Sequence, residues 1–476
     1  MQDRVSTGVQ GLDSVLGGGF PLGSLILVAG NPGTGKTVFS AQFLYQGAAD
    51  YGEPGVYASL SETRETFMHN MRGFGFDFES LERKGLFRYL DLLTVKEHAV
   101  PSILSMVVEE ASRLEAKRLV IDSYSALAQA FKEPIDARIV AHMILGKLVR
   151  RLGCTTIMVV EVPYGQRRIG LGIEEFVADG ILKLDMTELE GYRFRELEVL
   201  KLRGAELEEP KLAFTLKEGF KAFQPFNLKP IEKPKRFEPV QDLPDKYSTG
   251  SRSLDEALGG GLPKASVTLL ELDEKISTQM YHLILSPLSA NFALQGRGVF
   301  ILPSFGVDPL MLHRYAEVYG GTKEEWARYV RIIVAENFNL PRDLPNVITL
   351  KGEDWREDRE KVIRISKQLT METGQPNLTI LGVDTIATLY GEKKCVEILD
   401  LSATGARSSG ATIIAIVKAG FRDLAIKLSS IADVYLRLTR EHGCLLLYGV
   451  KPRTGLYAVE PDTSKGYPLP KLTPIV

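Results

Sequence analysis

Cysteine, histidine and long apolar runs are scarce in this sequence of 476 residues, and each scarcity excludes a class of protein. The three cysteines, Cys154, Cys395 and Cys444, are odd in number and widely spaced, so we expect a reducing compartment and no disulfide or zinc framework. The six histidines form no ligand cluster. No apolar run approaches the roughly 18 residues that a membrane-spanning helix needs, so no membrane association is expected.

An excess of basic charge is also missing. The formal net charge of −2 argues against a protein built chiefly to hold nucleic acid, although it leaves room for a local basic loop. The first residues, Met1 to Arg4, lead into structured sequence without an apolar stretch, so we expect a cytoplasmic rather than a secreted protein. The length predicts two or three domains of ordinary globular composition.

A glycine-rich loop follows the apolar run 25–29 and opens an amphipathic helix predicted over about 36–50. The loop and the first helical residues form the predicted nucleotide site, which comprises Gly30, Asn31, Pro32, Gly33, Thr34, Gly35, Lys36, Thr37 and Val38. Glycines let the backbone approach a phosphate chain closely, and consecutive N–H groups can then surround the phosphates. A strand before this pattern and a helix after it are typical of a P-loop.

Two side chains of the loop suit a metal-bound nucleoside triphosphate. The ammonium of Lys36 is placed for the β- and γ-phosphates, and the hydroxyl of Thr37 for Mg²⁺. The positive end of the helix dipole points at the same phosphates. The sequence therefore predicts ATP and Mg²⁺ as cofactors.

The sequence pattern at the start of the chain is repeated later in the chain. Ser6-Thr7-Gly8, Leu12-Asp13, Leu16-Gly17-Gly18-Gly19 and Pro21 all reappear 242 residues further on, from Ser248 to Pro263. Self-similarity at that distance indicates a duplicated domain rather than a solenoid. We therefore expect two halves that share one fold.

Apolar runs of strand length alternate with helical stretches in the first half. Strands are predicted near 25–29, 56–60, 118–122, 155–160 and 180–184, and helices near 64–74, 101–115 and 137–152. Continuous apolar strands separated by helices predict an α/β fold whose parallel sheet is buried on both faces. The runs 195–201 and 211–216 predict an antiparallel addition. Asp122 ends its strand as a Walker-B aspartate does, so we predict that it holds Mg²⁺ beside Thr37.

These motifs together resemble the KaiC-family ATPases of the RecA/RadA superfamily. The resemblance is carried by the repeated opening, the P-loop, the strand end Ile121-Asp122-Ser123, the stretch 172–179 and the run Lys201-Leu202-Arg203-Gly204. It covers essentially the whole chain and is weaker in the second half. It implies two tandem RecA-like P-loop domains, each a mostly parallel β-sheet flanked by helices, and a homo-oligomer in the form of a hexameric ring with ATP held between subunits.

The resemblance also implies catalytic roles. Lys201 and Arg203 match a Lys-x-Arg pair that reaches the γ-phosphate of a neighbouring subunit, although two exposed cations at a strand end are the alternative. The family usually has two consecutive glutamates after the second strand, but this chain has Ser61-Glu62. A serine hydroxyl cannot act as a carboxylate base, so Glu62 is the catalytic candidate and slow hydrolysis is expected. Glu161 is a weaker candidate for sensing the γ-phosphate.

The second half is predicted to keep the fold and to lose the site. The P-loop aligns with Leu272 to Gln279, which contains no glycine and has Asp273 and Glu274 where phosphate would bind. We predict an ATPase domain over 1–224, a proline-rich linker over 225–246 and a degenerate domain over 247–476. The run 378–384 still resembles a Walker-B strand, and 432–433 and 451–453 echo 178–179 and 201–203.

The sequence favours a slow ATPase that acts as a nucleotide-dependent switch through unidentified protein partners. One alternative is a RadA-like, DNA-dependent ATPase, because Tyr164, Arg167 and Arg168 lie in a glycine-containing loop that would suit contacts with single-stranded DNA. The acidic net charge disfavours nucleic acid as the partner. A second alternative is an assembly scaffold gated by nucleotide, with negligible hydrolysis.

Overall fold

A computed structural model describes residues 4–93, 100–129, 151–166, 169, 174–336 and 346–476 of the chain. The chain divides into two compact units. The first unit comprises Met1–Pro225, His442–Cys444 and Pro474–Val476, and the second comprises Phe226–Glu441 and Leu445–Thr473. Across the described ranges, the helices are all too short or too polar to cross a bilayer.

The first unit is built on a nine-stranded sheet with the order β11-β10-β9-β8-β3-β7-β6-β4-β5. Its strands are β3 (Leu25–Gly30), β4 (Gly55–Ser59), β5 (Phe87–Asp91), β6 (Arg118–Asp122), β7 (Thr155–Glu161), β8 (Gly180–Leu189), β9 (Tyr192–Leu202), β10 (Lys211–Thr215) and β11 (Lys221–Ala222). From β8 to β5 all neighbours are parallel, and β9, β10 and β11 continue the sheet antiparallel. The predicted α/β fold and its antiparallel addition are confirmed.

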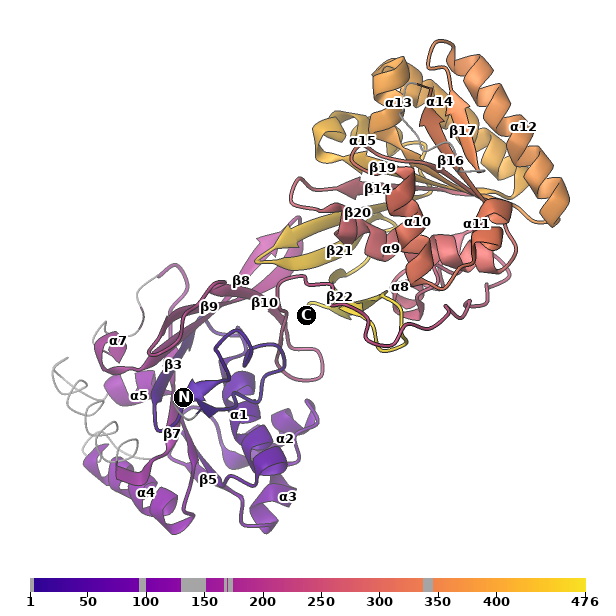
Figure 1. Cartoon of the computed structure of the whole chain (residues 1–476). Coiled ribbons are helices and arrows are strands. Elements are labelled where there is room, and N and C mark those ends of the chain that lie inside the picture. The colour runs from indigo at the N-terminus through magenta and orange to yellow at the C-terminus, as the bar shows by residue number, and fades with distance from the viewer. Residues whose placement is uncertain (1–3, 94–99, 130–150, 167–168, 170–173, 337–345) are drawn as a thin grey trace. The chain divides into compact units, whose positions relative to one another are not determined.

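Helices cover both faces of this sheet (Figure 1). They are α1 (Lys36–Tyr51), α2 (Arg64–Arg72), α3 (Phe78–Arg83), α4 (Val100–Arg113), α5 (Tyr124–Gln129) and α7 (Glu174–Val177), and a small hairpin, β1 (Arg4–Val5) with β2 (Phe20–Pro21), precedes them. Along β3, Ile26 and Val28 pack into the core with α1, α2 and α3, while Leu25, Leu27 and Ala29 face α4, α5 and α7. The predicted helix over 137–152 falls almost entirely outside the described residues.

A buried arginine fastens the start of β6 to α1. The side chain of Arg118 is 1% exposed, donates from Nε to Glu53 at 2.6 Å and from Nη1 to the carbonyls of Ser6 and Phe43 at 2.9 and 2.7 Å. Gly47 leaves room for it, because a Cβ at Gly47 would lie 2.2 Å from the Arg118 Nε. Burial lowers the pKa of Arg118, and the Glu53 carboxylate opposes that shift.

Replacing Arg118 with methionine is expected to lower the free energy of unfolding of the first unit by about 3 kcal/mol, because Glu53 and two carbonyls lose their donor. The matched control is Arg113→Met, since Arg113 is 62% exposed and pairs with Glu110 on its own helix. That control should cost less than about 0.5 kcal/mol. Urea unfolding of the full chain would measure both. Equal effects of the two variants would contradict the prediction.

The second unit repeats the topology on a ten-stranded sheet ordered β17-β16-β15-β18-β19-β14-β20-β21-β22-β23. Its strands are β14 (Val267–Leu272), β15 (Val299–Leu302), β16 (Val330–Ala335), β17 (Val347–Leu350), β18 (Leu378–Gly382), β19 (Thr412–Lys418), β20 (Val434–Glu441), β21 (Cys444–Lys451), β22 (Leu456–Asp462) and β23 (Leu469–Pro474). β14 lies between β19 and β20 as β3 lies between β7 and β8, so both halves share one fold, as the repeat predicted.

The helices of the second unit also pack on both faces of its sheet. They are α8 (Arg252–Ala257), α9 (Thr278–Leu294), α10 (Pro309–Val318), α11 (Lys323–Tyr329), α12 (Trp355–Thr373), α13 (Val383–Tyr390), α14 (Glu392–Ser409) and α15 (Arg422–Leu428), with a short turn η3 (Ala419–Phe421) and the small hairpin β12 (Lys246–Tyr247) and β13 (Leu262–Pro263).

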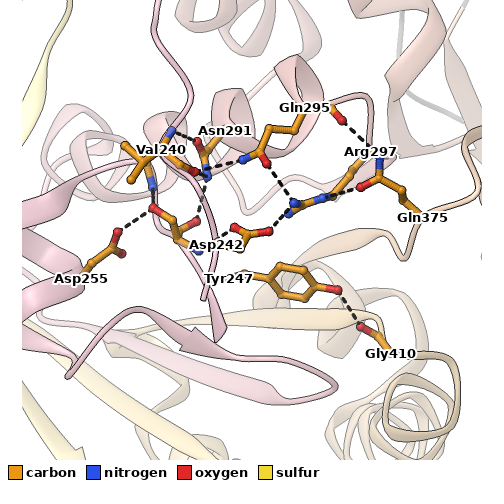
Figure 2. Close-up of polar contacts among 11 residues, drawn as sticks. Val240, Asp242, Tyr247, Asp255, Asn291, Gln295, Arg297, Gln375 and Gly410 are labelled. Carbon is orange, nitrogen blue, oxygen red and sulfur yellow. Dashed lines mark hydrogen bonds and ion pairs between the residues drawn. The ribbon is translucent and has the colours of Figure 1, made fainter. Parts of the chain in front are cut away.

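Residues 226–245, which fall within the predicted linker, form no helix or strand. Their end is fastened to the second unit (Figure 2). Asn291 on α9 accepts from the Val240 N–H at 2.8 Å, and the guanidinium of Arg297 bonds to the Asp242 carboxylate. Arg297 also lies over the ring of Tyr247, 5.0 Å from its centroid. This end of the segment is therefore an ordered part of the second unit rather than a free spacer.

Candidate nucleotide-binding site

The glycine-rich loop lies between β3, which ends at Gly30, and α1, which begins at Lys36. Gly33 and Gly35 have φ of 79° and 101°, the left-handed region that favours glycine. A Cβ at Gly30 would lie 2.4 Å from the carbonyl oxygen of Leu184 on β8, so only glycine fits there. The loop therefore leaves the carboxyl end of β3 and exposes backbone N–H groups at the start of a 16-residue helix.

Lys36 is folded over the loop that precedes it. Its Nζ donates to the carbonyls of Gly30 and Asn31, both at 2.9 Å, and the residue is 8% exposed. Burial lowers the pKa of Lys36, while the carboxylates of Glu161 and Asp122 oppose that shift. The ammonium is thus held inside the loop by two backbone carbonyls.

A buried acid lies beside the loop. The carboxylate of Asp122, the last residue of β6, accepts from the Thr37 hydroxyl at 3.0 Å and from the Tyr57 hydroxyl at 2.5 Å. Asp122 is 3% exposed, and burial raises its pKa although both hydroxyls and Lys36 oppose that shift. A carboxylate and a hydroxyl in contact are the oxygen ligands that Mg²⁺ takes in P-loop sites, so the donor set fits this ion.

Two glutamates lie at the same edge of the sheet. Glu62 follows β4, and its backbone is held by Ser59 and by the Tyr89 hydroxyl, which donates to the Glu62 carbonyl at 2.7 Å. Burial and the nearby Asp122 carboxylate raise the pKa of Glu62. Glu161 ends β7 directly opposite Gly30, and its side chain is exposed. The structure therefore places both predicted carboxylates near the loop.

Lys201 and Arg203 lie at the opposite edge of the sheet. Gly180 pairs with Ile26 on one side and with Leu202 on the other, so the end of β9 is level with the start of β3. Leu202 is thus level with Ile26, four residues before Gly30, which is about 13 Å along the strand at the usual rise. In addition, β8 lies between β9 and β3 in the sheet. Neither cation can contact a phosphate bound to the loop of its own chain.

The two cations do lie together. Lys201 donates from Nζ to the Glu175 carbonyl at 3.0 Å, and Arg203 from Nη1 to Asp179 at 2.9 Å. Arg203 is the first residue of the turn after β9 rather than a strand residue, and its side chain is 57% exposed. Both side chains therefore reach the segment 175–179, and Arg203 projects into solvent.

Two residues contact the loop without having been predicted to do so: Arg195 was not a predicted site residue, and Tyr164 was predicted only for contact with DNA. Arg195 on β9 is 6% exposed and donates from Nη1 to the Gly33 carbonyl at 3.2 Å. The sequence could have indicated Arg195, because it alternates with Leu197 and Val199 on the buried face of β9, where a cation is unusual. Tyr164 donates its hydroxyl to the Pro32 carbonyl at 2.9 Å. The loop considered for DNA contact is thus joined to the P-loop through Tyr164, whereas its Arg167 and Arg168 lie outside the described residues.

The second unit has the same element boundaries at this place but different chemistry. β14 ends at Leu272 and α9 begins at Thr278, which preserves the spacing of β3 and α1. Asp273 accepts from the Lys275 N–H at 3.1 Å and from the Thr439 hydroxyl at 3.2 Å. An acidic side chain thus occupies the turn where the first unit has its glycine-rich loop.

The run 378–384 contains a strand at the position of β6, but Asp384 does not take the position of Asp122. β18 pairs with β15 and β19 in the register that β6 has with β4 and β7, which puts Gly382 where Asp122 stands. Asp384 falls two residues later, on α13, and accepts from the Phe305 N–H at 2.9 Å. A side chain at Gly382 would collide with Ser304, whose Cα would lie 2.7 Å from its Cβ.

The residues of the second unit that match 178–179 and 201–203 make the same kinds of contact as their counterparts. Asp433 accepts from the Val267 N–H at 2.9 Å, as Asp179 does from the Leu25 N–H at 3.0 Å. Lys451 donates to the Ala432 carbonyl at 2.6 Å, much as Lys201 donates to Glu175. The second unit therefore keeps the framework at this edge although the loop at the other edge has changed.

A glycine-rich loop between a central parallel strand and a helix, with a buried aspartate on a nearby strand, defines a P-loop nucleotide-binding protein of the RecA-like class. Residues 5–222 match the family described as "ATPase: KaiC". The chain is 39% identical over 219 residues to UPF0273 protein MK0039 of Methanopyrus kandleri, covering 42% of this chain and 84% of that protein. The chain belongs to the KaiC family of ATPases.

Two further relatives carry the family name. The circadian clock oscillator protein KaiC of Synechococcus elongatus is 33% identical over 279 residues, which is 56% of this chain and 51% of that protein. The KaiC-like protein PH0186 from Pyrococcus horikoshii OT3, whose crystal structure is known, is 35% identical in sequence. The match covers 47% of this chain and all of that chain, and the TM-score is 0.43.

Proposed function

We propose that the first unit binds Mg-ATP and hydrolyses it slowly. The observation that carries this proposal is the contact of Thr37 with Asp122 at 3.0 Å, directly beside Lys36 at the head of α1. Bound Mg²⁺ would neutralise charge on the phosphates. The loop N–H groups would hold the phosphate chain, Lys36 would exchange its two carbonyl partners for phosphate oxygens, and Thr37 and Asp122 would hold the ion.

Glu62 is the residue that we assign to orienting the attacking water. Its raised pKa makes it a better proton acceptor than an ordinary glutamate, provided that it is ionised at the working pH. The neighbouring position has Ser61, whose hydroxyl is no base at neutral pH. One carboxylate instead of the family's two is the reason that we expect slow turnover.

Lys201 and Arg203 complete the site of a neighbouring copy in this proposal, because they lie too far from their own loop to act there. Phe176 and Leu200 support an interface at this edge of the sheet, since they are 74% and 47% exposed. Leu200 directly precedes Lys201, and Phe176 follows Glu175, whose carbonyl accepts from Lys201. Exposed large apolar side chains beside functional residues commonly mark a contact surface. A closed ring, hexameric as the family resemblance implies, would supply every loop with the cations of its neighbour.

We further propose that the chain acts as a nucleotide-dependent switch through protein partners, with ATP bound only by the first unit. The acidic turn at Asp273 and Glu274 would repel phosphate in the second unit. A DNA-dependent ATPase remains the alternative, and the contact of Tyr164 with Pro32 offers it a route from a bound strand to the P-loop.

The test is steady-state ATP hydrolysis by the full chain with and without single-stranded DNA, together with ATP stoichiometry and mass in solution. We expect one ATP per chain, a slow rate that DNA leaves unchanged, and a ring that ATP stabilises. Strong stimulation by DNA would favour a DNA-dependent ATPase over the nucleotide-dependent switch. A negligible rate in an ATP-held assembly would favour a scaffold gated by nucleotide.

A further inference from the structure

Two buried tyrosines lie side by side next to the candidate nucleotide site of the first unit. Tyr57 on β4 and Tyr89 on β5 are partners in the parallel register of the sheet, and they are 0% and 5% exposed. Their rings stack, with centroids 5.6 Å apart and an angle of 8° between the planes. The two side chains thus share one apolar environment, yet their hydroxyls bond to different residues of the site.

Packing fixes the position of both rings. Phe67 on α2 contacts each of them, with centroid distances of 4.5 Å to Tyr57 and 4.9 Å to Tyr89. All three side chains belong to the core that α1, α2 and α3 form with the sheet. Because interiors are close-packed, a ring in such a core has little freedom to move. Each hydroxyl is therefore a donor held at a fixed place beside the site.

Tyr57 supports the acid that we assign to Mg²⁺. Its hydroxyl donates to Oδ2 of Asp122 at 2.5 Å, and the Thr37 hydroxyl donates to the same oxygen at 3.0 Å. A phenol keeps its proton at neutral pH, so Tyr57 is the donor in this bond. Thr37 is itself a proposed ligand of the ion, whereas Tyr57 is a core residue of the strand next to Asp122. Tyr57 is therefore the support of Asp122 that holds no ligand position of its own.

This kind of support matters for metal affinity. Hydrogen bonds to a ligating carboxylate orient it, and loss of such a partner typically costs about 10–100-fold in metal affinity or activity. Both hydroxyls donate to Oδ2, so neither of these two donors occupies Oδ1 of Asp122. The bond from Tyr57 thus orients the carboxylate and leaves its second oxygen to other partners.

Tyr89 supports the residue that we assign to the attacking water. Its hydroxyl donates to the Glu62 carbonyl at 2.7 Å. The Ser59 hydroxyl donates to the same carbonyl at 3.0 Å and accepts from the Glu62 N–H at 3.1 Å. Glu62 lies between β4 and α2, outside regular structure, so these bonds fix its backbone in place of a helix or a strand. Tyr89 thereby acts on Glu62 in the way that Tyr57 acts on Asp122.

We propose that the stacked tyrosines are positioning residues with separate roles: Tyr57 orients Asp122 for Mg²⁺, and Tyr89 holds Glu62 for the attacking water. The inference rests on the proposed function, because the ion and the attacking water both belong to it. It assigns metal affinity to one hydroxyl and the rate of hydrolysis to the other.

The experiment compares Tyr57→Phe with Tyr89→Phe, because each variant removes one oxygen atom and keeps the ring. The full chain is titrated calorimetrically with AMP-PNP, a non-hydrolysable ATP analogue, once with Mg²⁺ and once with EDTA. The ratio of the two affinities is the factor by which Mg²⁺ tightens binding. We expect Tyr57→Phe to reduce this factor at least about tenfold, with the affinity in EDTA unchanged, and Tyr89→Phe to keep the factor of the unaltered chain.

Single-turnover hydrolysis gives the complementary measurement. Tyr89→Phe should lower the rate about tenfold even at saturating Mg²⁺, because Glu62 loses one of the two donors to its carbonyl. Tyr57→Phe should hydrolyse slowly at limiting Mg²⁺ and recover as the Mg²⁺ concentration rises. A general loosening of the core would not be reversed by the ion in one variant alone.

The outcomes separate this inference from the proposed function. If Mg²⁺ does not tighten AMP-PNP binding to the unaltered chain, the proposed function fails and the inference fails with it. If Mg²⁺ does tighten binding and Tyr57→Phe keeps the full factor, the inference alone is overturned. Equal losses of the factor in both variants would also refute it, because the cause would then be the shared core rather than one hydrogen bond.

Discussion

Replacing Lys36 with alanine is expected to weaken ATP binding at least 100-fold, a loss of about 2.7 kcal/mol. The ammonium is already desolvated at 8% exposure and held by the carbonyls of Gly30 and Asn31, so little reorganisation is needed when phosphate takes their place. Without this ammonium, only the loop N–H groups and the Mg²⁺ ion would interact with the negative charge of the phosphates. Calorimetric titration with Mg-ATP would measure the affinity.

The control for this variant is Lys217→Ala, an exposed lysine of the same unit. It should bind ATP as the unaltered chain does. The unfolding temperature without nucleotide should differ little between the two variants, whereas Mg-ATP should raise it only for Lys217→Ala. Undiminished affinity in Lys36→Ala would remove the central claim of the proposed function.

Replacing Arg203 with alanine is expected to lower the hydrolysis rate about 10³-fold while ATP affinity changes little. The reason is geometric, because the guanidinium lies at the amino end of the parallel strands, where its side chain is 57% exposed and donates to Asp179 of its own chain. Single-turnover hydrolysis and equilibrium binding on the same preparation would separate rate from affinity. Arg193→Ala is the control, since Arg193 is exposed near the other end of β9.

Mixing two inactive variants would decide whether Arg203 acts on a neighbour. A chain with Lys36→Ala cannot use its own loop but still presents Arg203, and a chain with Arg203→Ala has an intact loop. A mixed ring therefore contains interfaces at which both groups are present, and activity should return. If mixed assemblies form and activity stays at the level of the separate variants, Arg203 does not act in the neighbouring site.

The sequence by itself determined the elements that local chemistry specifies. The apolar run of β3, the glycines at φ of 79° and 101° and the helix from Lys36 are short-range features, and the structure has them where they were predicted. The parallel sheet followed from continuous apolar strands, and the shared fold of the two halves from the repeat at 242 residues. These predictions depend on patterns within about one supersecondary unit, or on direct comparison of the halves.

Tertiary structure alone decided which of these elements meet. Strand order and register place Lys201 and Arg203 at the edge of the sheet opposite Gly30, and put Gly382 rather than Asp384 at the position of Asp122. Register is fixed by packing across neighbouring strands, which no single segment encodes. Packing likewise brings Arg195 against Gly33, 162 residues away in the chain. The sequence could therefore name the glycine-rich loop as the candidate site, while the long-range contacts determined which side chains surround it.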